Sequence, residues 1–167
     1  MDDVVAVLAR EQRALEQLLF RLHHAREALA ADDDRFLGMA ADELEAAAHV
    51  VRELEAARAS AVGSTHDDTL QALADHAPEP YSSLLQEHRQ ALGRLAGEVG
   101  ALLEATHSLA ADRLAELRGE RPGRFRRRRR RPVPADDLDR AVAAASYESV
   151  LAASDSLRLP SLVRFLS

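Results

Sequence analysis

The chain has 167 residues and a net charge of −6, and apolar residues make up 47% of it. This length suits one domain with a single sizeable core. There is no cysteine, which excludes disulfides and thiolate metal sites. Aromatic residues reach only 4%, and alanine and leucine supply most of the apolar side, so the composition favours long helices over β-sheets.

The sequence carries no sign of export or membrane insertion. Its first residues, MDDVVAVLAREQ, lack the basic start and the uninterrupted apolar core of a signal peptide. No apolar run approaches the roughly 18 residues that a membrane span needs. We therefore expect a cytoplasmic protein.

A seven-residue apolar repeat marks the first helix, which Asp2 and Asp3 can cap and which we expect to run to about Ala31. One face carries Leu8, Leu15, Leu22 and Leu29. Such a stripe needs a partner helix. The acidic residues 32–34 predict a turn and an N-cap, and a second stripe follows at Leu37, Leu44 and Val51. Two long stripes joined by a short turn predict an antiparallel helical hairpin that ends at Gly63, a suitable C-cap.

The middle of the chain predicts a short helix and then a third long one. Residues 69–77 form the short helix, which Pro78 and Pro80 stop. The third long helix begins near Tyr81, and one row of its face carries Leu85, Leu92, Val99 and Thr106. Gly93, Gly97 and Gly100 weaken this helix, and they either permit close packing or mark a bend.

Three segments follow from these patterns: a helical bundle over residues 1–118, an arginine- and proline-rich linker over 119–135, and a C-terminal helical, partner-binding segment over 136–167. The tail of the last segment is densely apolar. The predicted fold class is all-α, an elongated antiparallel helical hairpin or bundle of three long helices plus this C-terminal helical segment.

Motifs for catalysis are absent from the sequence, which has no nucleophile elbow, Walker loop or dinucleotide fingerprint, so we do not expect an enzyme. Glu104 and His107 have the E-x-x-H spacing of di-iron bundles, but such a site needs a second motif and further inward glutamates. Glu45 and His49 lie off their helix's apolar stripe. We expect no metal or cofactor. His23 and His24 are interpreted as a surface pair, and His88 as a core or boundary histidine.

The segment GRFRRRRRRP contrasts with the acidic remainder of the chain. Residues 118–131 hold nine arginines and one acid, which leaves 13 basic and 27 acidic residues elsewhere. Three interpretations stay open: a solvated linker, attraction to an anionic membrane surface or acidic protein, and nucleic-acid binding, which is the least favoured. The residues that could make electrostatic contacts are Arg124, Arg126, Arg127, Arg128, Arg129, Arg130 and Arg131.

The order of these features resembles that of the FlgN-type flagellar export chaperones. Three segments carry the resemblance, namely LAREQRALEQLLFRLHHAREALAADDDRFL, ELEAAAHVVRELEAARAS with Arg58 closing a Leu-x-x-x-Arg pattern, and TLQALADHAPEPYSSLLQEHRQALGRLAGEV. The ending LPSLVRFL is similar to that of high-GC members. The resemblance implies a cytosolic chaperone of the type III export system. Such a protein holds hook-associated (hook–filament junction) subunits before secretion and binds their amphipathic terminal helices through its C-terminal region.

We expect the apolar C-terminal segment to contact such a partner by helix-in-groove recognition. Docking of the tail on its own bundle is the competing interpretation, and an exchange between the two states reconciles them. The candidate partner-binding residues are Leu138, Val142, Tyr147, Val150, Leu151, Leu157, Leu159, Leu162, Val163, Phe165 and Leu166. Export-apparatus components at the membrane are a further candidate partner. Two other functions remain open: a helical scaffold that self-associates through its heptad stripes, and a nucleic-acid-associated protein that uses the arginine run.

Overall fold

The computed structural model describes residues 1–31, 33–63, 69–119, 137–157 and 159–167, without the side chains of residues 34, 137–139 and 160. Its helices are α1 (Asp2–Ala31), α2 (Asp34–Val62), α3 (Leu70–His76), α4 (Tyr81–Leu117), α5 (Asp137–Ser156) and α6 (Pro160–Leu166). The described residues contain no strand, so the all-α prediction is confirmed.

The first two helices form the predicted hairpin, because each buries its heptad stripe. The fully buried leucines are Leu8, Leu15, Leu18, Leu22 and Leu29 on α1 and Leu37 and Leu44 on α2. The turn lies where the acidic residues predicted it. Asp33 holds the N-cap position, but its carboxylate binds the Arg35 guanidinium, with Nε 2.9 Å from Oδ1, and does not cap the helix.

Short-range signals set the ends of the next helices. Gly63 ends α2 with a φ of +81°, a left-handed conformation that a residue without a Cβ adopts at little cost. Thr69 caps α3, since its side-chain oxygen accepts a hydrogen bond from the Ala72 N–H at 3.2 Å. After the two prolines, α4 begins at Tyr81, as predicted.

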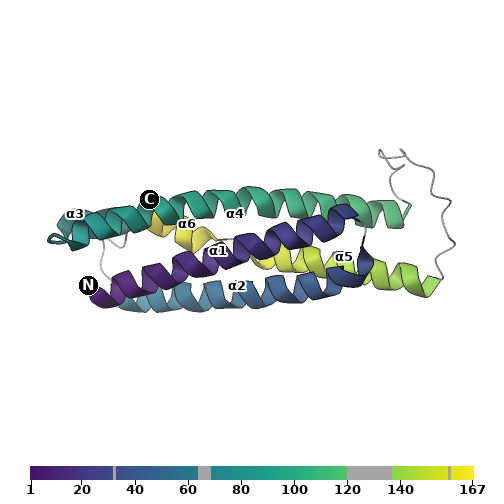
Figure 1. The fold of residues 1–167 in the computed structure, drawn as a ribbon, viewed down its shortest axis with the longest axis horizontal. Helices are drawn as coiled ribbons and strands as arrows, with labels where there is room; N and C mark the ends of the chain where they lie inside the picture. Colours follow the sequence, from purple (N-terminus) through teal and green to yellow (C-terminus); the bar gives the residue numbers. More distant parts are fainter. Residues whose placement is uncertain (32, 64–68, 120–136, 158) are drawn as a thin grey trace.

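The long helices are arranged as a bundle of four (Figure 1). α1 packs against α2 and α4, and α5 packs against the same two helices. α1 and α4 run in one direction, α2 and α5 in the other, and α6 continues in the direction of α5 toward the end where α3 lies. The C-terminal segment therefore fills the fourth position of the bundle, with its helical path divided between α5 and α6.

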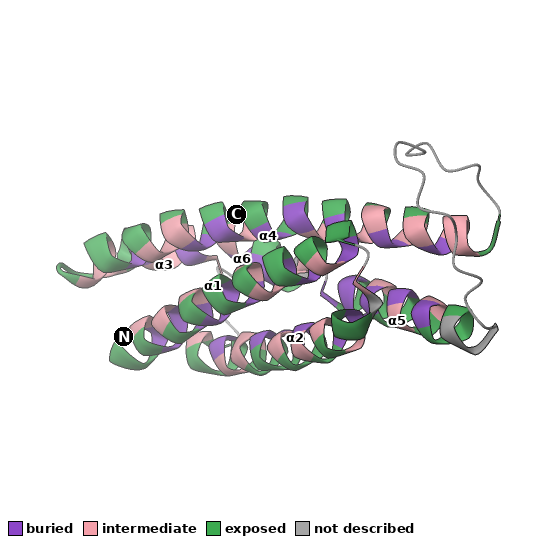
Figure 2. Cartoon of the chain, turned by 45° about the vertical axis from the view of Figure 1, so that its right-hand side comes forward, coloured by how far each residue is buried: buried purple, intermediate pink, exposed green. Residues whose placement is uncertain are grey.

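The core has two clusters, and the C-terminal segment contributes to both. The first cluster lies toward the end that holds the termini and includes Leu8, Leu92, Leu157, Leu162 and Phe165. The second lies near the α1–α2 turn and includes Leu29, Leu37, Tyr147 and Val150. Figure 2 shows the buried faces of the helices turned toward one another. Residues 137–167 thus share their apolar core with the first 118 residues.

This shared core predicts that a substitution in α5 destabilises the whole bundle. Tyr147 is 2% exposed, so we expect Tyr147→Ala to lower the free energy of unfolding by about 3–5 kcal/mol, as for other large aromatic side chains. Val142, on the same helix, is 57% exposed, and Val142→Ala should change stability by less than about 0.5 kcal/mol. Urea unfolding followed by circular dichroism measures both. Equal stability of the two variants would contradict the shared core.

Candidate partner-binding site

The predicted partner-binding residues divide into three groups by exposure. Five are buried, Tyr147, Val150, Leu157, Leu162 and Phe165, while Leu151, Leu159 and Leu166 are partly buried. Val142 and Val163 are exposed, at 57% and 56%. The side chain of Leu138 lies outside the described part of the chain. The structure therefore shows the tail docked on its own bundle, and contact of these residues with a partner stays a prediction.

Polar contacts with α2 accompany the docking of the tail. The Arg58 guanidinium lies over the Phe165 ring, with its carbon 4.4 Å from the ring centroid. Ser161 Oγ donates a hydrogen bond to Glu55 Oε1 at 2.6 Å. Arg52 Nη1 donates to the backbone carbonyl of Ser156 at 3.3 Å. These contacts join the last two helices to α2, while Leu162 and Phe165 face the core.

Beneath this contact lies a buried ion pair. Arg58 and Glu11 are 4% and 0% exposed, and Arg58 Nη1 donates a hydrogen bond to Glu11 Oε1. Glu11 Oε2 is buried without a hydrogen-bond partner in the structure. Burial raises the pKa of the Glu11 carboxyl group, against the opposing effect of Arg58, because burial disfavours the charged form. Arg58 therefore makes two stabilising contacts: it forms an ion pair with the buried Glu11 carboxylate, and it makes a cation–π contact with the Phe165 ring.

Glu11 is a residue that the sequence analysis missed. It follows Leu8 by three positions and precedes Leu15 by four, so it falls on the same helical face as the leucine stripe. An acidic residue on an apolar stripe is a signal that could have identified it. Arg58 was noted only as part of a family pattern, and the ion pair between the two follows from the packing of α1 on α2.

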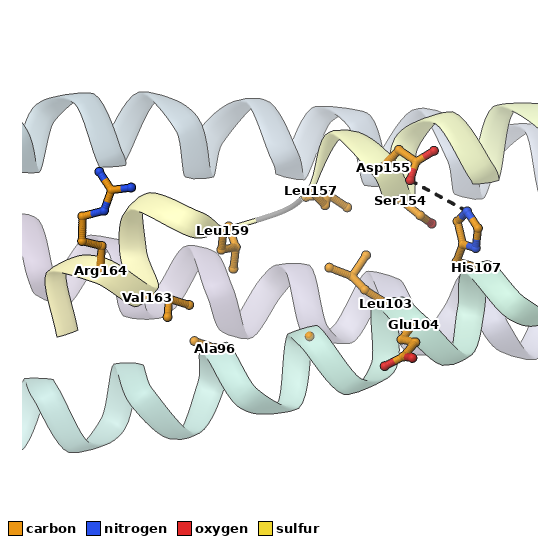
Figure 3. Close-up of a pocket in the computed structure, with 11 residues that line it drawn as sticks. Ala96, Leu103, Glu104, His107, Ser154, Asp155, Leu157, Leu159, Val163 and Arg164 are labelled. Carbon is orange, nitrogen blue, oxygen red and sulfur yellow. Dashed lines mark ion pairs between the residues drawn. The ribbon is translucent and has the colours of Figure 1, made fainter. Parts of the chain in front are cut away.

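A groove of about 760 Å³ lies between α4 and the C-terminal helices (Figure 3). Its apolar surface comprises Ala96, Gly100 and Leu103 of α4 with Leu157, Leu159 and Val163 of the C-terminal segment. Three residues predicted as partner contacts thus line a cavity that is open with the tail in place. The α4 residues opposite them were not predicted, because a groove wall depends on which helices become neighbours.

Charged side chains flank this apolar surface. At one end Asp155 Oδ1 lies 3.8 Å from His107 Nε2, next to Glu104 (Figure 3). Glu104 is exposed and has no ion-pair partner among the described residues. Arg164 lies at the other end of the groove, also exposed and without such a partner in that part of the chain. The groove therefore has acidic side chains at one end and Arg164, whose side chain extends away from α4, at the other.

The glycines of α4 do not support close helix packing. A Cβ placed on Gly93, Gly97 or Gly100 would meet no neighbouring atom within 4 Å. The prediction that they permit close packing is therefore wrong for the packing within this chain. Only Gly100 faces the groove, where the absence of a side chain lowers the α4 wall.

The histidines that the structure describes lie at the surface or at the boundary of the core. His23 and His24 are exposed, as predicted for a surface pair, and the His24 ring contacts the Phe20 ring at a tilt of 52° with centroids 4.4 Å apart. His88 is partly buried, and burial lowers its pKa by disfavouring the imidazolium form. His49 lies 3.2 Å from Glu53 on the surface. Within the residues that the structure describes, no three His, Cys, Asp or Glu side chains gather as metal ligands.

Comparison of the chain with protein-family models, with curated proteins and with solved structures found no match. The resemblance to FlgN-type chaperones therefore stays a prediction. Arg124 and Arg126–Arg131 lie outside the described residues, and so do all three interpretations of the arginine run. No helix in the described ranges combines the length and the apolar character of a membrane span.

The buried ion pair leads to a prediction for a double-mutant cycle. Arg58→Met leaves Glu11 buried and unpaired, so we expect it to lower the free energy of unfolding by about 3–5 kcal/mol. Glu11→Leu combined with Arg58→Met replaces the pair by apolar side chains and should recover most of this loss. Urea unfolding of the two single variants and the double variant tests the cycle. A double variant no more stable than Arg58→Met would contradict this account.

The raised pKa of Glu11 predicts a dependence of stability on pH. Between the ordinary value of 4.5 and the raised value, the folded protein keeps a proton that the unfolded chain releases. The contribution of Glu11 to stability is therefore complete below pH 4.5 and falls as the pH rises through the raised pKa. Glu11→Gln removes this titration, so wild-type stability relative to Glu11→Gln should decrease over that window. A difference that stays constant with pH would contradict the raised pKa.

Proposed function

We propose that this chain is a protein-binding helical bundle that acts as an export chaperone for flagellar hook-associated subunits. The observation that carries the proposal is the open groove, one wall of which is formed by Leu157, Leu159 and Val163 of the C-terminal segment. An amphipathic helix buries its apolar face in a groove of this kind. The resemblance to FlgN-type chaperones supports the choice of partner, namely the terminal helices of secreted subunits.

The exposure of the C-terminal residues suggests two stages of contact. Leu159 and Val163 are accessible from the groove while α6 is docked. Leu162 and Phe165 face the first cluster, so a partner reaches them only after α6 has left its place. We propose the groove as the first contact and exchange of α6 as a later step that gives tight binding.

The scaffold alternative depends on free heptad stripes. Leu8, Leu15, Leu22 and Leu29 are all 0% exposed within a single chain, so these side chains are occupied by the fold itself. The nucleic-acid alternative depends on the arginine run, while the rest of the chain carries 13 basic and 27 acidic residues and would repel phosphate. Both observations favour the chaperone proposal over the two alternatives.

The proposal predicts that an acidic substitution in the groove weakens capture of hook-associated subunits. Val163 is exposed, so Val163→Asp should leave the fold intact and reduce affinity by about tenfold or more, which corresponds to the loss of one apolar contact of about 1.4 kcal/mol. Val50→Asp is the matched control, because Val50 is an exposed valine of α2 outside the groove. Co-purification of full-length variants with candidate hook-associated proteins gives the measurement.

Three outcomes of this experiment would support, extend or rule out the proposal. Loss of capture by Val163→Asp alone supports the groove as the contact. Loss by Val142→Asp as well extends the contact along α5, as the wider set of predicted residues requires. No capture of any hook-associated protein by the wild type would rule out the chaperone proposal. Point variants are preferable to removal of residues 136–167, because that deletion would also remove Tyr147 and Val150 from the core.

A further inference from the structure

The groove between α4 and the C-terminal helices combines an apolar middle with opposite charges at its two ends (Figure 3). Leu103 and Leu159 lie toward its middle, Glu104 and Asp155 toward one end, and Arg164 toward the other. His107 Nε2 lies 3.8 Å from Asp155 Oδ1. Glu104, by contrast, has no ion-pair partner among the described residues. Such an arrangement discriminates among partners by the signs of their charges as well as by their apolar area.

Small residues on α4 make room for the backbone of another helix. Ala96 and Gly100 are four positions apart, so they lie on the same face of α4, one turn from each other. A Cβ on Gly100 would meet nothing within 4 Å, and Val163 across the groove is 56% exposed. A low wall opposite exposed apolar side chains suits a helix that lies along α4.

The length of the α4 wall limits the length of the contact. Ala96 and Glu104 are separated by eight positions, which is a distance of about 12 Å along α4 at roughly 1.5 Å per residue. A bound helix therefore meets the groove over roughly two to three turns. Charges at the two ends of a stretch of two turns on the bound helix lie about seven residues apart.

We propose that the groove binds one amphipathic helix with a basic residue facing Glu104 and Asp155 and an acidic residue, about two turns away, facing Arg164. The side chain of Arg164 extends away from α4 in Figure 3. The proposed contact requires its guanidinium to rotate toward the bound helix. This inference deepens the proposed function and rests on it for the source of the helix, a terminal segment of a secreted subunit.

The test uses full-length protein and three designed, fluorescein-labelled peptides of about 18 residues, long enough to form a helix on binding. All three share one stripe of alanine and leucine. One has arginine at one end of the stripe and glutamate at the other, one has arginine at both ends, and one has glutamate at both. Fluorescence anisotropy should rank the peptide with mixed charges above the doubly acidic peptide by about fivefold or more.

Variants of the groove test the assignment of individual residues. Glu104→Arg should reverse the preference and favour the doubly acidic peptide. Gly100→Leu places a Cβ in open space and extends the side chain into the groove, and it should weaken binding of the mixed-charge peptide by about tenfold or more. Gly97→Leu is the matched control, since Gly97 also has open space around its Cβ but does not line the groove, and it should bind like the wild type. Circular dichroism confirms that each variant folds.

Four results would overturn the inference: equal binding of the three peptides, no binding of any of them up to about 1 mM, unchanged binding by Gly100→Leu, or a groove occupied by a second copy of the chain. Occupation of the groove by a second copy would appear in light scattering as a doubled mass, which Gly100→Leu would abolish. Capture of hook-associated subunits unaffected by Gly100→Leu overturns the groove as their site and leaves the proposed function standing. The expected peptide ranking without capture of any such subunit overturns the proposed function and leaves the groove chemistry standing.

Discussion

The structure depends on the apolar stripes of three long helices, which a fourth helical element has to cover. α1, α2 and α4 bury Leu8, Leu44 and Leu92 toward a common interior, and without α5 and α6 one side of that interior would face water. The C-terminal segment covers it along two consecutive helices. Leu162 of this segment is fully buried, but the segment leaves the surface of α4 uncovered beside Ala96 and Gly100. The groove lies in this uncovered region.

Much of the fold could be predicted, because its signals are local. The leucine repeat of α1, Gly63 at the end of α2 and the prolines before α4 each act within a few residues of their own position. The place of the tail could not be predicted in the same way. An apolar stripe indicates that a helix face will be covered, but it does not say whether the same chain or a partner covers it. From the sequence, Phe165 could therefore pack in the core of its own chain or contact a partner.

The candidate site was less predictable because it joins residues from separate helices. Leu157, Leu159 and Val163 could be identified from the apolar tail alone, whereas Gly100 and Glu104 acquire their place only through the packing of α4 beside α6. The ion pair between Glu11 and Arg58 similarly depends on the register of α1 against α2. Sequence patterns give the faces of helices, and the pairing of polar side chains across those faces requires their three-dimensional positions.

Two helices, α5 and α6, fill the fourth position of the bundle, and the shorter of them can unfold locally. α6 is a seven-residue helix, and a segment of this length has little helical stability of its own in water. Its order is therefore supplied by Leu162, Phe165 and the hydrogen bond from Ser161, and the segment can detach and fray at a lower free energy than that of global unfolding. Detachment would admit water to the Arg58 guanidinium, so that α6 regulates the hydration of the buried pair that Arg58 forms with Glu11.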